Sequence, residues 1–133
     1  MKRLVELVRV QYDTLKKRFN KALEEKDKEL KKKEEEIREI KETVINHLIE
    51  KDDIEGLKKL LYFYGDLEDI KYTLEKAKEE GKDVYWVAKK ISEALEPELV
   101  AYALYQIDKE KAEELLADYG IDIEEFKKEF ELS

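Results

Sequence analysis

The sequence contains no cysteine, one histidine, one proline and four glycines among its 133 residues. The lack of cysteine excludes disulfide bonds, thiolate nucleophiles and Cys-bearing zinc or iron–sulfur centres. Because His47 is the only imidazole, neither a multi-histidine metal site nor a Ser/His/Asp triad is expected. The glycines are too widely spaced for a GxxxxGK or GxGxxG phosphate-binding loop. We therefore expect no catalytic residues, no cofactor and no metal ligands, and we expect that the protein is not an enzyme.

Long apolar runs are also missing from the sequence. No run is long enough for a membrane span, and the N-terminal segment lacks the unbroken apolar stretch and cleavage site of a signal peptide. We therefore expect no membrane span and a cytoplasmic location. Asparagine, glutamine, serine, threonine and methionine are scarce, whereas lysine and glutamate are abundant. This composition favours helices and is typical of thermophile proteins, so we expect a heat-stable protein.

What is abundant is charge, at 47% of residues, together with 42% hydrophobic residues. That apolar share is sufficient for a core and argues against intrinsic disorder. No segment combines strand alternation with turn signals, so the sequence predicts an all-α fold.

The first part of the chain, residues 1–50, contains no glycine or proline, and its apolar residues keep one helical phase. At 100° per residue they fall within a sector of about 100°. They are Leu4, Val5, Val8, Tyr12, Leu15, Phe19, Leu23, Leu30, Ile37, Ile40, Val44 and Leu48. We predict one long amphipathic helix over about 1–50. The alternative is a helical hairpin that turns within the charged stretch 24–36.

A continuous helix of this length would measure about 75 Å, whereas a globular domain of 133 residues has a radius of gyration of about 14 Å. The chain cannot cover such a helix by itself, and a second copy is the simplest cover. Leu4, Leu15, Lys26, Ile37 and Leu48 are spaced by elevens. An 11-residue repeat predicts a straight or slightly right-handed coiled coil. We therefore expect a homodimer.

Residues 51–133 are predicted to form an acidic helical domain, a bundle of five or six short helices with recognisable caps. Aspartates can cap the helices 54–64, 67–80, 84–95, 109–119 and 123–131, and Pro97 suits the first turn of a helix over 97–107. The glycines at 65, 81 and 120 can close three of them. The stretches 53–65 and 108–120 match in length and both end in Leu-Leu-x-x-Tyr-Gly, through duplication or chance.

Bulky residues surround two of these helices. The segment 97–107 is apolar nearly all round, which predicts the central core helix. Tyr62, Phe63 and Tyr64 are consecutive, and Trp86 follows Tyr85 directly. Adjacent aromatic residues point to different sides of a helix, so some of them are expected to face a partner. The alternative is that all of them pack within the fold.

The remaining polar candidates favour structural roles. We interpret His47 as a last-turn residue that complements the helix dipole, because a single histidine among surface carboxylates makes a poor metal site. The carboxylate clusters 34–36 and 124–125 are expected to lie on solvated helix faces.

Charge is divided unequally between the two parts. Residues 1–51 hold 15 basic and 12 acidic residues, whereas residues 52–133 hold 12 basic and 23 acidic residues. A basic amphipathic helix can contact a membrane, a nucleic acid or an acidic protein surface. The acidic remainder of the chain disfavours the first two partners and favours protein docking, in cis or within a dimer.

We therefore expect a non-enzymatic protein–protein interaction or assembly protein that dimerises through its N-terminal helix and has a possible further protein partner. Two alternatives remain open. One is a nucleic-acid-associated regulator with a helix-turn-helix-like segment over about 97–131, and the other is an acidic protein that occupies a basic partner. The candidate interface residues are Leu4, Val8, Tyr12, Leu15, Phe19, Leu23, Leu30, Ile37, Tyr62, Phe63, Tyr64 and Trp86.

Overall fold

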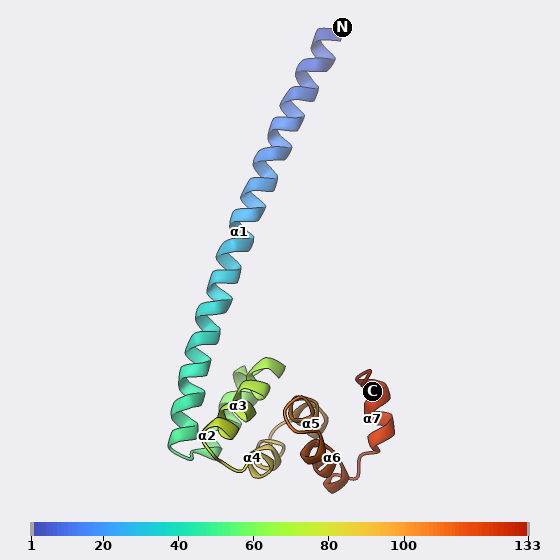
Figure 1. The fold of residues 1–133 in the computed structure, drawn as a ribbon. Helices are drawn as coiled ribbons and strands as arrows, with labels where there is room; N and C mark the ends of the chain where they lie inside the picture. Colours follow the sequence, from blue (N-terminus) through green and yellow to red (C-terminus); the bar gives the residue numbers. More distant parts are fainter. Residues whose placement is uncertain (1, 133) are drawn as a thin grey trace. The chain divides into compact units, whose positions relative to one another are not determined.

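The computed structural model describes residues 2–132, and every regular element in that part of the chain is a helix (Figure 1). The predicted all-α fold is confirmed. The described elements are α1 (Lys2–Glu50), α2 (Ile54–Tyr64), α3 (Leu67–Glu79), α4 (Val84–Ile91), α5 (Pro97–Tyr105), α6 (Lys109–Asp118) and α7 (Ile123–Glu129).

Helix α1 runs without interruption through the charged stretch 24–36 (Figure 1). The alternative of a helical hairpin is therefore wrong. Opposite charges four residues apart, such as Glu24 with Lys28 and Glu29 with Lys33, favour helix in this stretch although Leu30 is its only apolar residue.

The chain divides into two compact units, Met1–Ile40 and Lys41–Ser133. The sequence placed the division after residue 50, whereas the structure assigns the last part of α1 to the second unit. The reason is local packing, because Ile45 and Ile49 are buried in a small cluster with Leu57 of α2. These α1 residues were expected to belong to a free helix.

Aspartates cap five of the short helices as predicted. Each side chain accepts a hydrogen bond from a backbone N–H in the first helical turn, which satisfies a donor that has no partner within the helix. The capping residues are Asp53, Asp66, Asp83, Asp108 and Asp122. Pro97 occupies the first turn of α5, as expected from its fixed φ.

The helix ends differ from the predictions at several places. Gly65 closes α2 as predicted, with φ −85°, whereas Gly81 and Gly120 close α3 and α6 with φ of +74° and +68°. Accordingly, Gly65 is followed directly by the cap Asp66, whereas one residue, Ile121, stands between Gly120 and the cap Asp122, and its N–H donates to the Leu116 carbonyl. Helices α4 and α5 are shorter than predicted.

The core of the second unit is centred on α5, which packs against α3 and α6. Its residues Val100, Ala101, Ala103 and Leu104 are fully buried, which confirms the predicted central helix. Two alanines at these positions allow neighbouring helices to approach closely. The same cluster includes Leu61, Ile70, Leu74, Val87, Ile91, Leu115, Leu116 and Phe126.

Two polar contacts join the end of α1 to α3 within the second unit. The Lys41 ammonium lies 3.0 Å from Oδ2 of Asp69, and the Tyr72 hydroxyl donates to Oδ1 of Asn46 at 2.8 Å. Together with Ile45 and Ile49, these contacts fix the last turns of α1 in the folded unit.

Candidate interaction surfaces

The first candidate surface lies on α1 and consists of eight predicted interface residues. All eight are exposed, with 46% to 71% of the residue surface accessible to solvent. We call this set the apolar stripe: Leu4, Val8, Tyr12, Leu15, Phe19, Leu23, Leu30 and Ile37. Large apolar side chains exposed along one helix face are typical of sites that bind another molecule.

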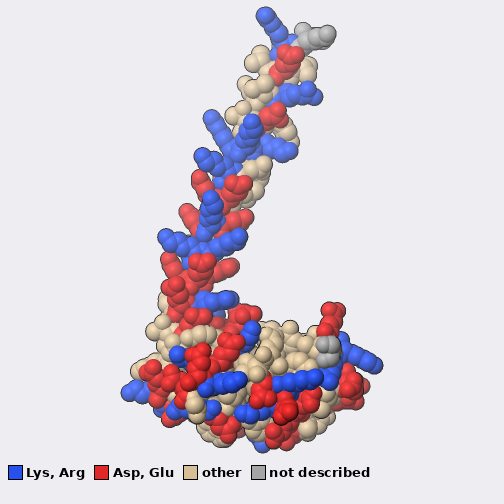
Figure 2. All heavy atoms as spheres, in the orientation of Figure 1, with Lys and Arg blue, Asp and Glu red and all other residues tan. Residues whose placement is uncertain are grey.

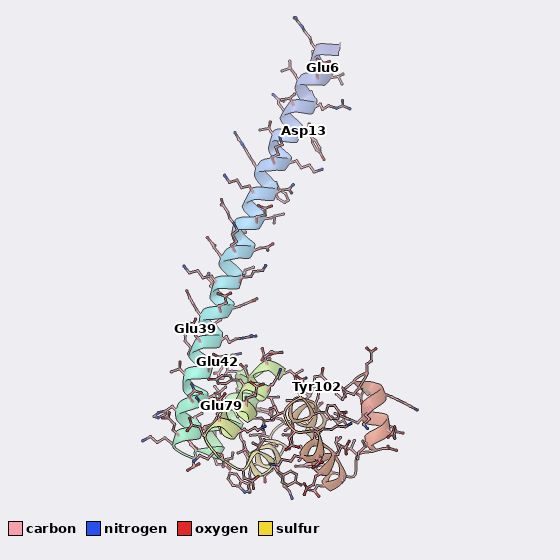
Figure 3. All side chains as sticks on the ribbon, viewed as in Figure 1. Glu6, Asp13, Glu39, Glu42, Glu79 and Tyr102 are labelled. Carbon is pink, nitrogen blue, oxygen red and sulfur yellow. The ribbon has the colours of Figure 1, made fainter. Side chains whose placement is uncertain are left out.

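The face of α1 opposite the stripe is mainly polar. At 100° per residue, Glu6 and Asp13 point away from the stripe, and both carry labels in Figure 3. Val10, 62% exposed, also lies on this opposite face. Its position makes Val10 a natural control for any experiment on the stripe.

Charge changes sign along α1. Residues 2–21 hold seven basic and two acidic residues, whereas residues 22–40 hold six basic and eight acidic residues. Figure 2 shows basic side chains gathered over the N-terminal part of the helix and acidic ones becoming frequent further along. The helix thus carries a positive half followed by a weakly negative half.

The second candidate surface lies on α2, where Tyr62, Phe63 and Tyr64 are 63%, 68% and 70% exposed. The rings of Tyr62 and Phe63 meet edge to face, with centroids 4.9 Å apart. We call these three residues the aromatic surface. The structure therefore leaves all three predicted residues on the outside of the fold, and the alternative that they pack within it is wrong.

An open groove borders the aromatic surface, with Lys58 and Glu93 on its sides. The Lys58 ammonium pairs with Glu93 of the segment after α4, and it lies 3.1 Å from Oε1 of Glu55. Hydrogen bonding to Glu93 and then to Glu55 raises the pKa of Lys58. The same bond from Lys58 lowers the pKa of Glu93. Both shifts favour the charged forms, so the ion pair neutralises the groove wall beside the aromatic rings.

Trp86, the remaining predicted interface residue, is 46% exposed. It borders a pocket of about 140 Å³ whose lining includes Ile49, Leu57 and Val87. The Lys90 ammonium lies 5.9 Å from the centroid of its ring. Trp86 is therefore partly buried on one side and free to contact a partner on the other.

Across residues 2–132, no group of three or more histidine, cysteine, aspartate or glutamate residues is placed to hold a metal ion. His47 is exposed in the last turn of α1. Within the same residues, no helix has the length and apolar character needed to cross a bilayer.

The segment 97–131 folds as three consecutive helices, α5, α6 and α7. A helix-turn-helix would insert the N-terminal end of its last helix into a DNA groove. The first turn of α7 carries Glu124 and Glu125, and its cap is Asp122. Three carboxylates at this end would repel phosphates, so nothing in this segment favours DNA binding.

Two features of these surfaces escaped prediction from the sequence. Lys58 and Glu93 are 35 residues apart, and no local pattern indicates that they meet. The hydroxyl of Tyr85 is buried without a hydrogen-bond partner. The position of Tyr85 next to Trp86 in the sequence does not indicate this burial. By contrast, helical periodicity identified the whole apolar stripe.

Comparison with protein-family models, with curated proteins and with solved structures gives no match. The surfaces described above are therefore the basis for a functional proposal.

Proposed function

We propose that this chain is a non-enzymatic interaction or assembly protein that forms a homodimer through the apolar stripe of α1. The exposure of the stripe carries the proposal, because eight large apolar side chains on one helix face are left in water. Removing such side chains from water favours association. A second copy offers the same stripe and needs no further component.

The aromatic surface supports a further protein partner. Tyrosine and other aromatic residues are enriched in the central parts of protein interfaces. The surface belongs to α2, in the second unit, whereas the stripe belongs to residues 4–37. The two surfaces therefore share no residue. The excess of acidic residues over residues 41–133, 25 against 14 basic, favours a partner with a basic surface.

The dimer is tested by light scattering on two matched variants, Leu15→Lys and Val10→Lys. Leu15 lies in the stripe and Val10 on the opposite face, and both are exposed by similar fractions, 68% and 62%. We expect a mass of twice 15.9 kDa for the wild-type chain and for Val10→Lys, and a single-chain mass for Leu15→Lys. Both variants add the same charge, so a difference between them reports burial of the stripe.

A wild-type chain that is monomeric at micromolar concentration and retains its full helical circular dichroism signal would overturn the proposal. Equal dissociation of Leu15→Lys and Val10→Lys would also count against it, since charge alone would then govern assembly.

A further inference from the structure

We infer that the two copies pair in antiparallel orientation along residues 2–40 of α1, with Leu4 of each copy beside Ile37 of the other. The inference rests on the proposed homodimer and adds the orientation and register of its partner. Four features support it: the spacing of the stripe, the charges within it, the charges beside it and the opposite net charge of residues 2–21 and 22–40.

The spacing of the stripe is nearly the same when read in either direction, so that opposed positions agree to within one residue. Together with Lys26 and Glu34, the stripe residues follow intervals of four, four and three along the helix. When a second copy of the helix lies antiparallel to the first, two residues face each other if their numbers add up to about 42. Apolar residues then face apolar residues at three pairs of positions: Leu4 with Ile37, Tyr12 with Leu30, and Phe19 with Leu23.

Charged residues in or beside the stripe oppose a parallel pairing. In a parallel dimer in register, Lys26 faces Lys26 of the second copy and Glu34 faces its own counterpart. Like charges in direct contact are destabilising. In the antiparallel register, the aliphatic stem of Lys26 lies against Leu15, and its ammonium group can reach solvent.

Charges that border the stripe also favour the antiparallel register. Near both edges of the stripe, a charged residue of one copy faces an opposite charge of the other copy where the two residue numbers add up to about 43. These pairs are Arg9 with Glu34, Lys16 with Asp27, and Arg18 with Glu25. Each pair occurs twice by symmetry.

The net charges of the two halves of the helix also favour the antiparallel orientation. Antiparallel pairing sets the positive half of each helix, residues 2–21, beside the weakly negative half of the other, residues 22–40. Parallel pairing sets the two positive halves side by side.

A shorter antiparallel overlap is the main competitor. If residue numbers add up to about 27, Leu4 meets Leu23 and Val8 meets Phe19. This register places the two positive halves together, and it leaves Leu30 and Ile37 uncovered although both are more than half exposed. The full overlap covers the whole stripe and brings unlike charges together, so we favour it.

Distances between spin labels test the register, because the cysteine-free chain accepts a single label at a chosen site. Glu35→Cys and Arg3→Cys each place the label on the face opposite the stripe, as judged at 100° per residue. The expected distance between two labels combines two components. The axial component is about 1.5 Å per residue, and the lateral component, from the helix separation and the label arms, is about 25 Å.

For the full antiparallel overlap, double electron–electron resonance should give about 50 Å between the two labels at position 35 and about 60 Å at position 3. A parallel dimer should give about 25 Å at both positions. The shorter overlap should give about 70 Å at position 35 and about 40 Å at position 3. Either of the last two patterns overturns the inferred register.

Two controls separate this inference from the proposed dimer. Adding Leu15→Lys to Glu35→Cys should abolish the dipolar signal, because the two labels sit on different chains. Light scattering on the same samples gives the mass. A monomeric mass overturns the proposed function itself, whereas a dimer with the parallel or short-overlap distances overturns only the register. A trimer or tetramer contradicts the two-helix pairing.

Discussion

The ammonium nitrogen of Lys41 lies 3.0 Å from Oδ2 of Asp69, whose side chain is only 4% exposed. The same Asp69 oxygen accepts a hydrogen bond from the Asp66 backbone N–H at 3.0 Å and thereby completes the capping box of α3. One carboxylate therefore caps α3 and anchors the end of α1. Loss of that carboxylate leaves two donors without their partner.

Asp69→Ala should destabilise the protein by about 2–3 kcal/mol, because a partly buried ammonium and a backbone N–H both lose their acceptor. Asp69→Asn should cost less, since the amide oxygen can still accept from Asp66. Urea denaturation monitored by circular dichroism measures both values. Equal losses for the two variants would contradict the shared role of the carboxylate.

The unpaired hydroxyl of Tyr85 gives a prediction of the opposite sign. Its oxygen is buried with no hydrogen-bond partner, and a buried polar atom without a partner costs about 1–3 kcal/mol. Tyr85→Phe keeps the ring and removes that atom, so it should raise the free energy of unfolding by about 1 kcal/mol. As a control, Tyr72→Phe should lower the free energy of unfolding, because the Tyr72 hydroxyl donates to Asn46.

Glu131 has φ +55°, a left-handed conformation that is unfavourable for a residue with a Cβ atom. Glu131→Gly should therefore stabilise the fold by about 1 kcal/mol. Glu125→Gly provides the matched control, because it removes the same side chain from within α7 and should destabilise by up to about 1 kcal/mol. Thermal unfolding of the two variants should shift in opposite directions, and a shift of both in the same direction would refute the assignment.

The ion pair between Lys58 and Glu93 predicts a dependence of stability on pH. Since Lys58 lowers the pKa of Glu93, the stabilisation from this carboxylate is present at neutral pH and is lost as the pH falls through the lowered pKa. Glu93→Gln should therefore reduce the difference in urea midpoint between about pH 6 and about pH 3.

On the alkaline side, Glu93 raises the pKa of Lys58, so that contribution is lost only as the pH rises through the raised value. Lys58→Met should reduce the loss of stability at high pH. An unchanged pH profile in both variants would show that the pair contributes nothing to folding.

Much of the fold could be predicted because the decisive signals are local. Asp53, Asp66, Asp83, Asp108 and Asp122 each mark a helix start, and side-chain capping needs only the next three residues. The phase of the apolar residues in α1 likewise depends only on spacing, and so the sequence alone identified the exposed stripe.

What could not be predicted depends on tertiary contacts or on strained backbone. Burial of Ile45 and Ile49 depends on packing against Leu57, which no periodicity encodes. Asp52 and Glu131 adopt φ +55° at helix ends where sequence rules favour glycine.

Helix α4 ends at Ile91 rather than near residue 95, and Pro97 restricts only the residue directly before it. The residue before a proline is restricted to extended backbone, and Glu96 accordingly has ψ 124°. The intervening residues form tight turns, with the N–H groups of Ala94 and Leu95 donating to the Ile91 carbonyl.

Trp86 is the single tryptophan of the chain, and it borders the pocket next to Ile49 and Leu57 with almost half of its surface in solvent. The protein therefore carries an intrinsic fluorophore at one defined position. A shift of its emission on adding a binding partner would report occupancy of this part of the second unit without any label. Residues 2–40 contain no tryptophan, so a change in emission reports on the surroundings of Trp86 in the second unit.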